Sequence, residues 1–165
     1  MRGILREKGL REEDPYEHVV ASAAVIDEPN KELSYRTIIE QASDILADRL
    51  DTDQQFLVDS FCKAQDMGTI PLGNGTVINH IRVDEDFEPQ MVLVRIPESI
   101  TVSTEGFDIL DEEETGEVEN LCAMIFLVSS SEHSSQHLRL IAHLAEMIDA
   151  KHFIERWKSA ANESE

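Results

Sequence analysis

Two histidines are the residues of this chain whose surroundings are most typical of a chemical site. His80 follows the turn-forming segment Gly73-Asn74-Gly75 and a short stretch predicted to be a strand, and His137 begins an apolar run predicted to be a helix. An imidazole ring titrates near neutral pH, so one ring can act as a nucleophile while a second carries charge or donates a hydrogen bond. Two such rings on rigid elements indicate a site of chemistry, or the evolutionary remnant of one.

Simpler interpretations of these histidines stay open at this stage. His80 alone is typical of a strand histidine that bonds a backbone carbonyl, and His137 alone is typical of a residue that begins a helix. His133 lies four residues before His137 and would give three histidines with His80, as in some zinc sites. No carboxylate or cysteine completes that set, so we predict neither a metal site nor a cofactor.

The composition narrows the class of protein. A chain of 165 residues with 41% hydrophobic residues is long enough for one buried core and too short for two ordinary domains. The formal net charge of −20, from 34 acidic and 14 basic residues, argues against a nucleic-acid partner, because phosphate backbones need a positive surface. Such a surface favours a basic partner instead.

Cysteine usage and hydropathy favour a cytoplasmic protein. Cys62 and Cys122 fall in a predicted helix and a predicted buried strand, where free cysteines are usually small core residues. The longest fully apolar run, residues 121–128, is far shorter than the roughly 20 residues of a membrane helix. The start of the chain has no apolar segment of the kind that signal peptides carry.

The first half of the chain predicts one strand and two helices. We interpret residues 1–16 as a charged leader or linker, 17–160 as one α/β domain and 161–165 as a tail. A strand is expected over 19–26, and Ser34 is expected to cap a helix whose apolar positions recur every three or four residues. Thr52-x-x-Gln55 matches a capping box for a second helix. The apolar face of that second helix is expected to hold Phe56, Leu57, Phe61 and Ala64.

The second half predicts the rest of a mixed sheet. Glycines and Pro71 force turns before a strand at 76–80, a strand follows at 91–96, and the uniformly apolar segment 121–128 is typical of a central strand covered on both faces. The acidic segment 108–119 is expected to be a loop. A deeply packed helix should begin near His137 and a last helix should span 152–159. The fold class is therefore α/β, a mixed β-sheet flanked by helices on both faces.

Two of these segments together resemble a known family. The first is the segment from Gly73 to His80. The second is the strand 125–128, followed by the segment His137-Leu138-Arg139-Leu140-Ile141-Ala142-His143-Leu144-Ala145. They are similar to the enzyme IIA domain of the bacterial sugar phosphotransferase system, in its type 2 class (fructose, mannitol, nitrogen-regulatory). The likeness spans about residues 17–160. It implies that His80 accepts a phosphoryl group from the small carrier HPr and that His137 is its partner.

The resemblance also suggests how a phosphate would be held. Glycines at 73 and 75 let backbone N–H groups approach a phosphate, and Arg82 is a candidate contact. Two positions depart from the family pattern. Asn79 stands where the family has proline, and alanine and glutamine at 64–65 replace an Arg-Glu pair. Loss of that guanidinium removes a strong phosphate partner, so the competence of His80 for phosphotransfer stays open.

A subgroup of the family is fused behind membrane transporters of the amino-acid permease, antiporter and chloride-channel types. Those domains often lack the same arginine and begin with a charged linker to which residues 5–16 are similar. We therefore expect a cytosolic regulatory domain, tethered to the inner face of the membrane as part of a transporter, and non-catalytic. Its partners would be the transporter's membrane part or an HPr-like carrier, and a homodimer is compatible with the sequence.

Two alternatives stay open beside this expectation. The first is an active phosphocarrier that takes phosphate from HPr on His80 and passes it to a sugar permease. The second is a histidine-based sensor for a metal or a small ligand.

Overall fold

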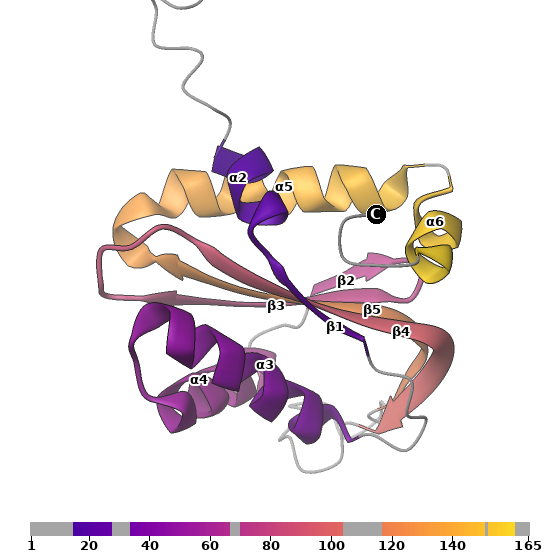
Figure 1. The fold of residues 1–165 in the computed structure, drawn as a ribbon, viewed down its shortest axis with the longest axis horizontal. Helices are drawn as coiled ribbons and strands as arrows, with labels where there is room; N and C mark the ends of the chain where they lie inside the picture. Colours follow the sequence, from indigo (N-terminus) through magenta and orange to yellow (C-terminus); the bar gives the residue numbers. More distant parts are fainter. Residues whose placement is uncertain (1–14, 28–33, 67–69, 104–116, 151, 161–165) are drawn as a thin grey trace, which may run out of the picture.

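The computed structural model describes residues 15–27, 34–66, 70–103, 117–150 and 152–160, and a five-stranded mixed sheet forms its centre (Figure 1). The strand order is β1-β4-β5-β3-β2. The β1/β4 and β3/β5 pairs are parallel, and the β2/β3 and β4/β5 pairs are antiparallel. The strands are β1 (Ala24–Asp27), β2 (Ile70–Gly73), β3 (Thr76–Val83), β4 (Gln90–Ser103) and β5 (Glu117–Ser130).

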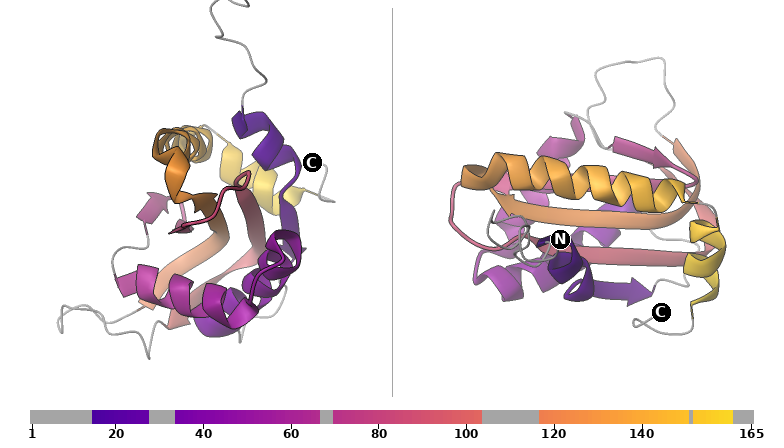
Figure 2. Two further views of the ribbon diagram at one scale, coloured as in Figure 1. Left: turned by 90° about the vertical axis from the view of Figure 1, so that its left-hand side faces the viewer. Right: turned by 90° about the horizontal axis from the view of Figure 1, so that it is seen from above.

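Helices cover both faces of this sheet, as Figures 1 and 2 show. Two of them, α3 (Tyr35–Leu50) and α4 (Gln54–Asp66), pack on one face; α2 (Pro15–Ala21), α5 (Ser134–Asp149) and α6 (Phe153–Ser159) lie on the other. A short 3₁₀ helix, η1 (Ser131–His133), joins β5 to α5. The predicted fold class is confirmed. Within the part of the chain described, no helix is long and apolar enough to cross a membrane.

The central position of β5 was expected from its uniformly apolar sequence. All ten residues from Leu121 to Ser130 are buried, because β4 and β3 flank the strand and helices cover both of its faces. Side chains alternate between faces along a strand. Phe126 therefore joins the core under α3 and α4, whereas Leu127 joins the core under α5.

Helix α3 forms as predicted, and the start of α4 needs a correction. Ser34 caps α3 by accepting a hydrogen bond from the backbone N–H of Thr37 at 3.2 Å. Asp53, not Thr52, accepts the corresponding bond at the start of α4, from the N–H of Phe56 at 2.9 Å. The buried stripe of α4 consequently contains Leu57, Val58 and Phe61, and Phe56 is 46% exposed.

The first predicted strand, 19–26, is strand only over residues 24–26, and residues 19–21 belong to a helix. Helix α2 ends at Ala21, and only Ala24–Asp27 pair with β4. Pro15 at the first helical position has a pre-set φ that suits a helix start, and Val19 packs into the core formed with α5. A short apolar run does not distinguish strand from helix by periodicity alone, and here the packing against α5 decides in favour of the helix.

A β-hairpin between β2 and β3 was also missed. Asn74 and Gly75 form its two-residue turn with φ of 53° and 72°. Positive φ at both central residues is the geometry that Asn-Gly favours in hairpins, so this dipeptide was the available signal. Strand β5 begins at Glu117, inside the predicted acidic loop; residues 104–116 and the glycine at 68 lie outside the described residues.

Helix α5 is less deeply packed than its composition suggested. Leu140, Leu144 and Ile148 are buried, but Leu138 is 66% exposed. The helix packs on the sheet with one face, and in the view from above none of the described helices or strands lies over its outer face (Figure 2, right). The last helix matches its prediction closely, beginning at Phe153 after His152 as its N-cap.

We expect Gly75→Ala to destabilise the fold strongly. Alanine would be strained at φ 72°, and its Cβ would lie 2.1 Å from the backbone oxygen of Asn120. The strain and the steric overlap together should lower the free energy of unfolding by roughly 2–4 kcal/mol, measured by urea denaturation. Asn74→Gly is the matched control, since glycine tolerates φ 53° and should change stability by less than about 0.5 kcal/mol. Equal stability of the two variants would contradict this account of the turn.

Candidate functional site

Strand β3 directs His80 toward the helix α5. Alternation along the strand places Ile78, His80 and Arg82 on one face. Ile78 is fully buried in the core that also contains Leu140 and Leu144 of α5. His80 follows two residues later and is half-buried, so its ring lies at the edge of that core.

Helix α5 brings His137 to the same place. His137 is in the first turn of the helix and is 3% exposed. Leu140, Leu144 and Ile148 follow at intervals of three and four residues and anchor the helix in the core. The N-terminal end of α5 therefore stands beside the middle of β3, and a residue 57 positions further along the chain meets His80.

The two imidazole rings are joined by a direct hydrogen bond. His137 Nε2 lies 3.1 Å from His80 Nδ1, and the ring centroids are 4.9 Å apart at an interplanar angle of 54°. Ser129 Oγ lies 2.5 Å from the other nitrogen of His137, Nδ1. The parallel register pairs Ser129 of β5 with Arg82 of β3, which explains why the serine reaches this site.

Both rings are held neutral near pH 7. Burial, and then the charge of Arg82, lowers the pKa of His80 below its ordinary value of 6.5. The pKa of His137 is lowered to about 4. Burial is the largest cause, followed by the charges of His80 and Arg82. A neutral imidazole keeps a lone pair on one ring nitrogen. Since His80 Nδ1 is bonded to His137, the ring nitrogen left for a ligand is Nε2.

The other predicted phosphate-binding residues lie at different distances from this pair. Arg82 is exposed on the same face of β3 as His80, and its charge acts on both rings. Gly75 precedes β3, and five residues of extended strand put it about 16 Å along the chain from His80. Gly73 lies further back, at the end of β2. The two glycines form and flank the hairpin turn, and their position gives no support to the phosphate-binding role that we expected.

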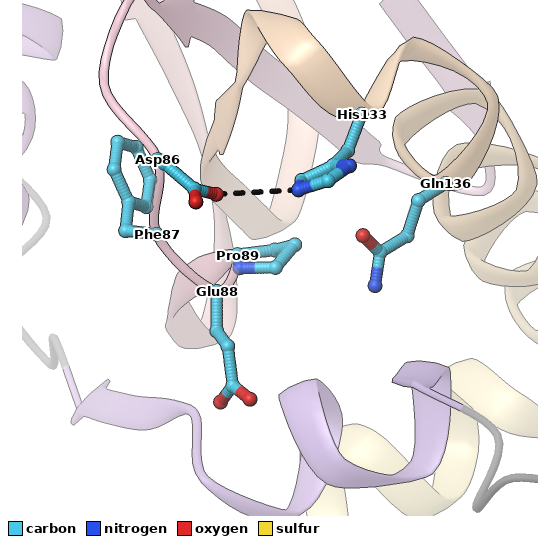
Figure 3. A pocket seen from close by; sticks show the side chains of 6 residues that line it. All are labelled: Asp86, Phe87, Glu88, Pro89, His133 and Gln136. Carbon is cyan, nitrogen blue, oxygen red and sulfur yellow. Dashed lines mark hydrogen bonds and ion pairs between the residues drawn. The ribbon is translucent and has the colours of Figure 1, made fainter.

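His133 does not join the histidine pair. Its Nε2 lies 3.3 Å from Asp86 Oδ1, on the wall of a cavity of about 300 Å³ (Figure 3). That cavity is lined by Asp86, Phe87, Glu88, Pro89, His133 and Gln136. Within the described part of the chain, no three His, Cys, Asp or Glu residues are grouped so that they could hold a metal ion. The three-histidine arrangement considered from the sequence therefore does not form here.

The fold and the histidine pair can now be compared with known proteins. The family model for the phosphoenolpyruvate-dependent sugar phosphotransferase system, EIIA 2, matches residues 23–165. The chain belongs to this family. No curated protein matches the sequence.

Solved structures share this EIIA fold. Nitrogen regulatory protein IIA-Ntr from Neisseria meningitidis is 18% identical, with a TM-score of 0.68 over 87% of this chain and 89% of that chain. IIA mannitol from Escherichia coli is 18% identical, with a TM-score of 0.57 over 84% and 89%. The mannitol-specific cryptic phosphotransferase enzyme IIA CmtB from the same organism is 19% identical, with a TM-score of 0.54 over 87% and 88%. At these identities the likeness concerns the fold alone.

The structure shows what two polar residues near the histidine pair contact, which the sequence did not reveal. Asn79, which replaces the proline of the EIIA pattern, points to the opposite face of β3 and accepts a 2.6 Å hydrogen bond from the hydroxyl of Tyr35. Ser129 is 1% exposed and bonds His137. A polar pair of residues ending the apolar run 121–128 was the available signal for Ser129, but only the β3/β5 register shows what it contacts.

The lowered pKa of His137 makes stability depend on pH. Because folding lowers this pKa from 6.5 to about 4, the unfolded chain binds more protons between these values. The contribution of His137 to folding stability is therefore fully present above pH 6.5 and is lost as the pH falls toward 4. Between pH 8 and pH 5 the free energy of unfolding should fall by about 2 kcal/mol more in the wild type than in His137→Gln, measured by urea denaturation. Parallel curves for the two proteins would show that His137 titrates normally.

Proposed function

We propose that this chain is an EIIA-like regulatory domain in which His80 is the phosphoryl-binding side chain, and that it serves as the cytosolic domain of a membrane transporter. The observation that carries the site assignment is the direct His80–His137 hydrogen bond at the edge of the core. A neutral ring beside a second neutral ring and a guanidinium is a suitable receptor for a phosphoryl group.

The chemistry of such a site follows from its geometry. In phosphoryl transfer, a lone pair on His80 Nε2 attacks phosphorus in line, and the P–N bond to the donor histidine breaks with its electron pair moving to the donor ring. The ring of His80 becomes cationic, and its Nδ1–H is stabilised by donating to His137 Nε2 across the 3.1 Å contact. Arg82 offsets part of the negative charge of the phosphoryl oxygens.

Two features favour regulation over rapid phosphate relay. Ala64, at one of the positions of the Arg-Glu pair, packs against the core under α3 and α4, so α4 supplies no guanidinium there. The β3–β4 connection carries four exposed carboxylates within eight residues of His80: Asp84, Glu85, Asp86 and Glu88. Their field opposes a doubly charged phosphoryl group, so the phosphorylated state should be less favoured than in a dedicated carrier.

An active phosphocarrier is the second candidate, because the neutral state of both rings favours it. The burial that lowers both pKa values keeps His80 unprotonated on one nitrogen at neutral pH. The net charge of −20 would also assist encounter with a basic HPr-like donor. Phosphorylation by such a donor is therefore the experiment that separates the two candidates.

We expect little or slow phosphorylation of His80 in the reconstituted system. The protein would be incubated with phosphoenolpyruvate, enzyme I and HPr of the source organism and followed by intact mass, with His80→Ala as the negative variant. His143→Ala is the matched control, since His143 is an exposed histidine on the outer face of α5. A rapid single adduct in the wild type and in His143→Ala, absent in His80→Ala, would establish the phosphocarrier and contradict the regulatory proposal.

The transporter proposal has a separate test. Antibodies raised against this domain would be used on fractionated cells of the source organism. A signal in the membrane fraction, at a mass well above the 18.6 kDa of this chain, is the expected result. A signal confined to the soluble fraction at 18.6 kDa would contradict the fusion and leave the EIIA site unaffected.

A further inference from the structure

Ser129 extends the histidine pair into a chain of three hydrogen-bonded side chains. Its Oγ lies 2.5 Å from His137 Nδ1, and His137 Nε2 lies 3.1 Å from His80 Nδ1. Ser129 and His137 are 1% and 3% exposed, and His80 is the member that reaches the surface. We name this series the Ser129–His137–His80 chain. Its direction decides which nitrogen of His80 carries a proton.

The direction follows from the hydroxyl of Ser129. A hydroxyl has one proton to donate, and among the described residues the only side-chain hydrogen bond of Ser129 is the one to His137 Nδ1. If Nδ1 of His137 carried a proton, it would donate to Oγ, and the proton of the buried hydroxyl would have no acceptor. Buried donors without acceptors are rare because they are costly. The hydroxyl therefore donates to a lone pair on Nδ1.

The remaining protons then have fixed places. A neutral His137 with a lone pair on Nδ1 carries its proton on Nε2 and donates it to His80 Nδ1. A neutral His80 that accepts at Nδ1 carries its proton on Nε2. Burial lowers the pKa values of both histidines, in agreement with two neutral rings.

We propose that Ser129 is a positioning residue that holds His80 in the tautomer with an N–H group, not a lone pair, at Nε2. This inference rests on the proposed function of His80 as the phosphoryl-binding side chain. In this resting state His80 Nε2–H and the neighbouring Arg82 are both hydrogen-bond donors, so the site binds an anion without attacking it. Attack on phosphorus requires the chain to reverse, with His137 Nδ1–H donating to Ser129.

In the reversed chain, His80 can take a phosphoryl group from a small donor such as phosphoramidate. The lone pair of His80 Nε2 attacks phosphorus, the P–N bond of zwitterionic phosphoramidate breaks, and ammonia leaves with the electron pair. The phosphorylated ring keeps its Nδ1 proton, which is donated to His137 Nε2. Phosphoramidate needs no protein docking, so its rate reports the state of His80 alone.

Nitrogen-15 NMR of the wild type tests the tautomer directly. The protein would carry ¹⁵N-histidine and be studied at pH 8, with His80→Gln and His137→Gln used to assign the signals. We expect a proton on Nε2 and none on Nδ1 of both rings. A proton on Nδ1 of both rings would overturn the inference, and this result would leave the proposed function untouched, because no phosphoryl donor is involved.

Substitutions of Ser129 test whether the tautomer controls reactivity. Ser129→Asp replaces the donor by an acceptor and should reverse the chain, raising the rate of phosphorylation by phosphoramidate about tenfold, the effect of one buried hydrogen bond. Ser129→Thr keeps the hydroxyl and should therefore retain the wild-type tautomer of His80. Ser129→Ala removes the preference and should give an intermediate rate, which keeps the test usable if the aspartate variant does not fold.

The outcomes separate the inference from the function on which it rests. If Ser129→Asp folds and shows the reversed tautomer, an unchanged rate of phosphorylation by phosphoramidate would overturn the role of Ser129. If Ser129→Asp does not fold, an unchanged rate in Ser129→Ala would overturn it. The expected tautomers with no adduct in any variant would contradict His80 as the phosphoryl-binding residue, while the direction of the chain would still be supported. His80→Ala supplies the background rate in each case.

Discussion

Burial of β5 between two helical layers is the constraint on which the site depends. The strand is apolar on both faces, so it occupies the centre of the sheet, and its parallel register with β3 then places Leu127 beside His80 and Ser129 beside Arg82. Because β5 leads directly through η1 into α5, the same strand also determines where the helix starts. His137 in the first helical turn consequently lies over β3. A change of one residue in the β3/β5 register would turn the site to the opposite face.

The site also illustrates how a strongly acidic protein can keep a neutral, cation-flanked centre. Burial removes the histidine rings from water and opposes their protonation, while Arg82 adds a repulsive positive charge. Among the described residues, nearly all acidic side chains are instead exposed, including those of the connection that follows β3. This separation allows the surface to remain acidic while the two rings stay neutral near neutral pH.

Under the proposed function, phosphate handling would depend on what surrounds His80 as much as on His80 itself. The EIIA family match covers most of the chain, but the residues around His80 differ from the pattern at Asn79 and in α4. Asn79 faces away from the site and bonds Tyr35, so its effect is on the packing of α3 against the sheet. Ser129 faces the site and bonds His137 directly. Differences between members of this family are therefore best interpreted from the face on which each residue lies.

The amino-acid sequence alone determined the broad features of this protein. The uniform apolarity of 121–128 predicted a central strand, the spacing from Tyr35 to Leu46 predicted a helix with one buried face, and the segments around His80 and His137 indicated the family. These are local signals, since periodicity and composition act over a few residues. The tertiary structure alone decided the rest. Whether residues 15–21 form helix and which atom of His137 meets Ser129 both depend on contacts between segments distant in the sequence, and no local pattern encodes such contacts.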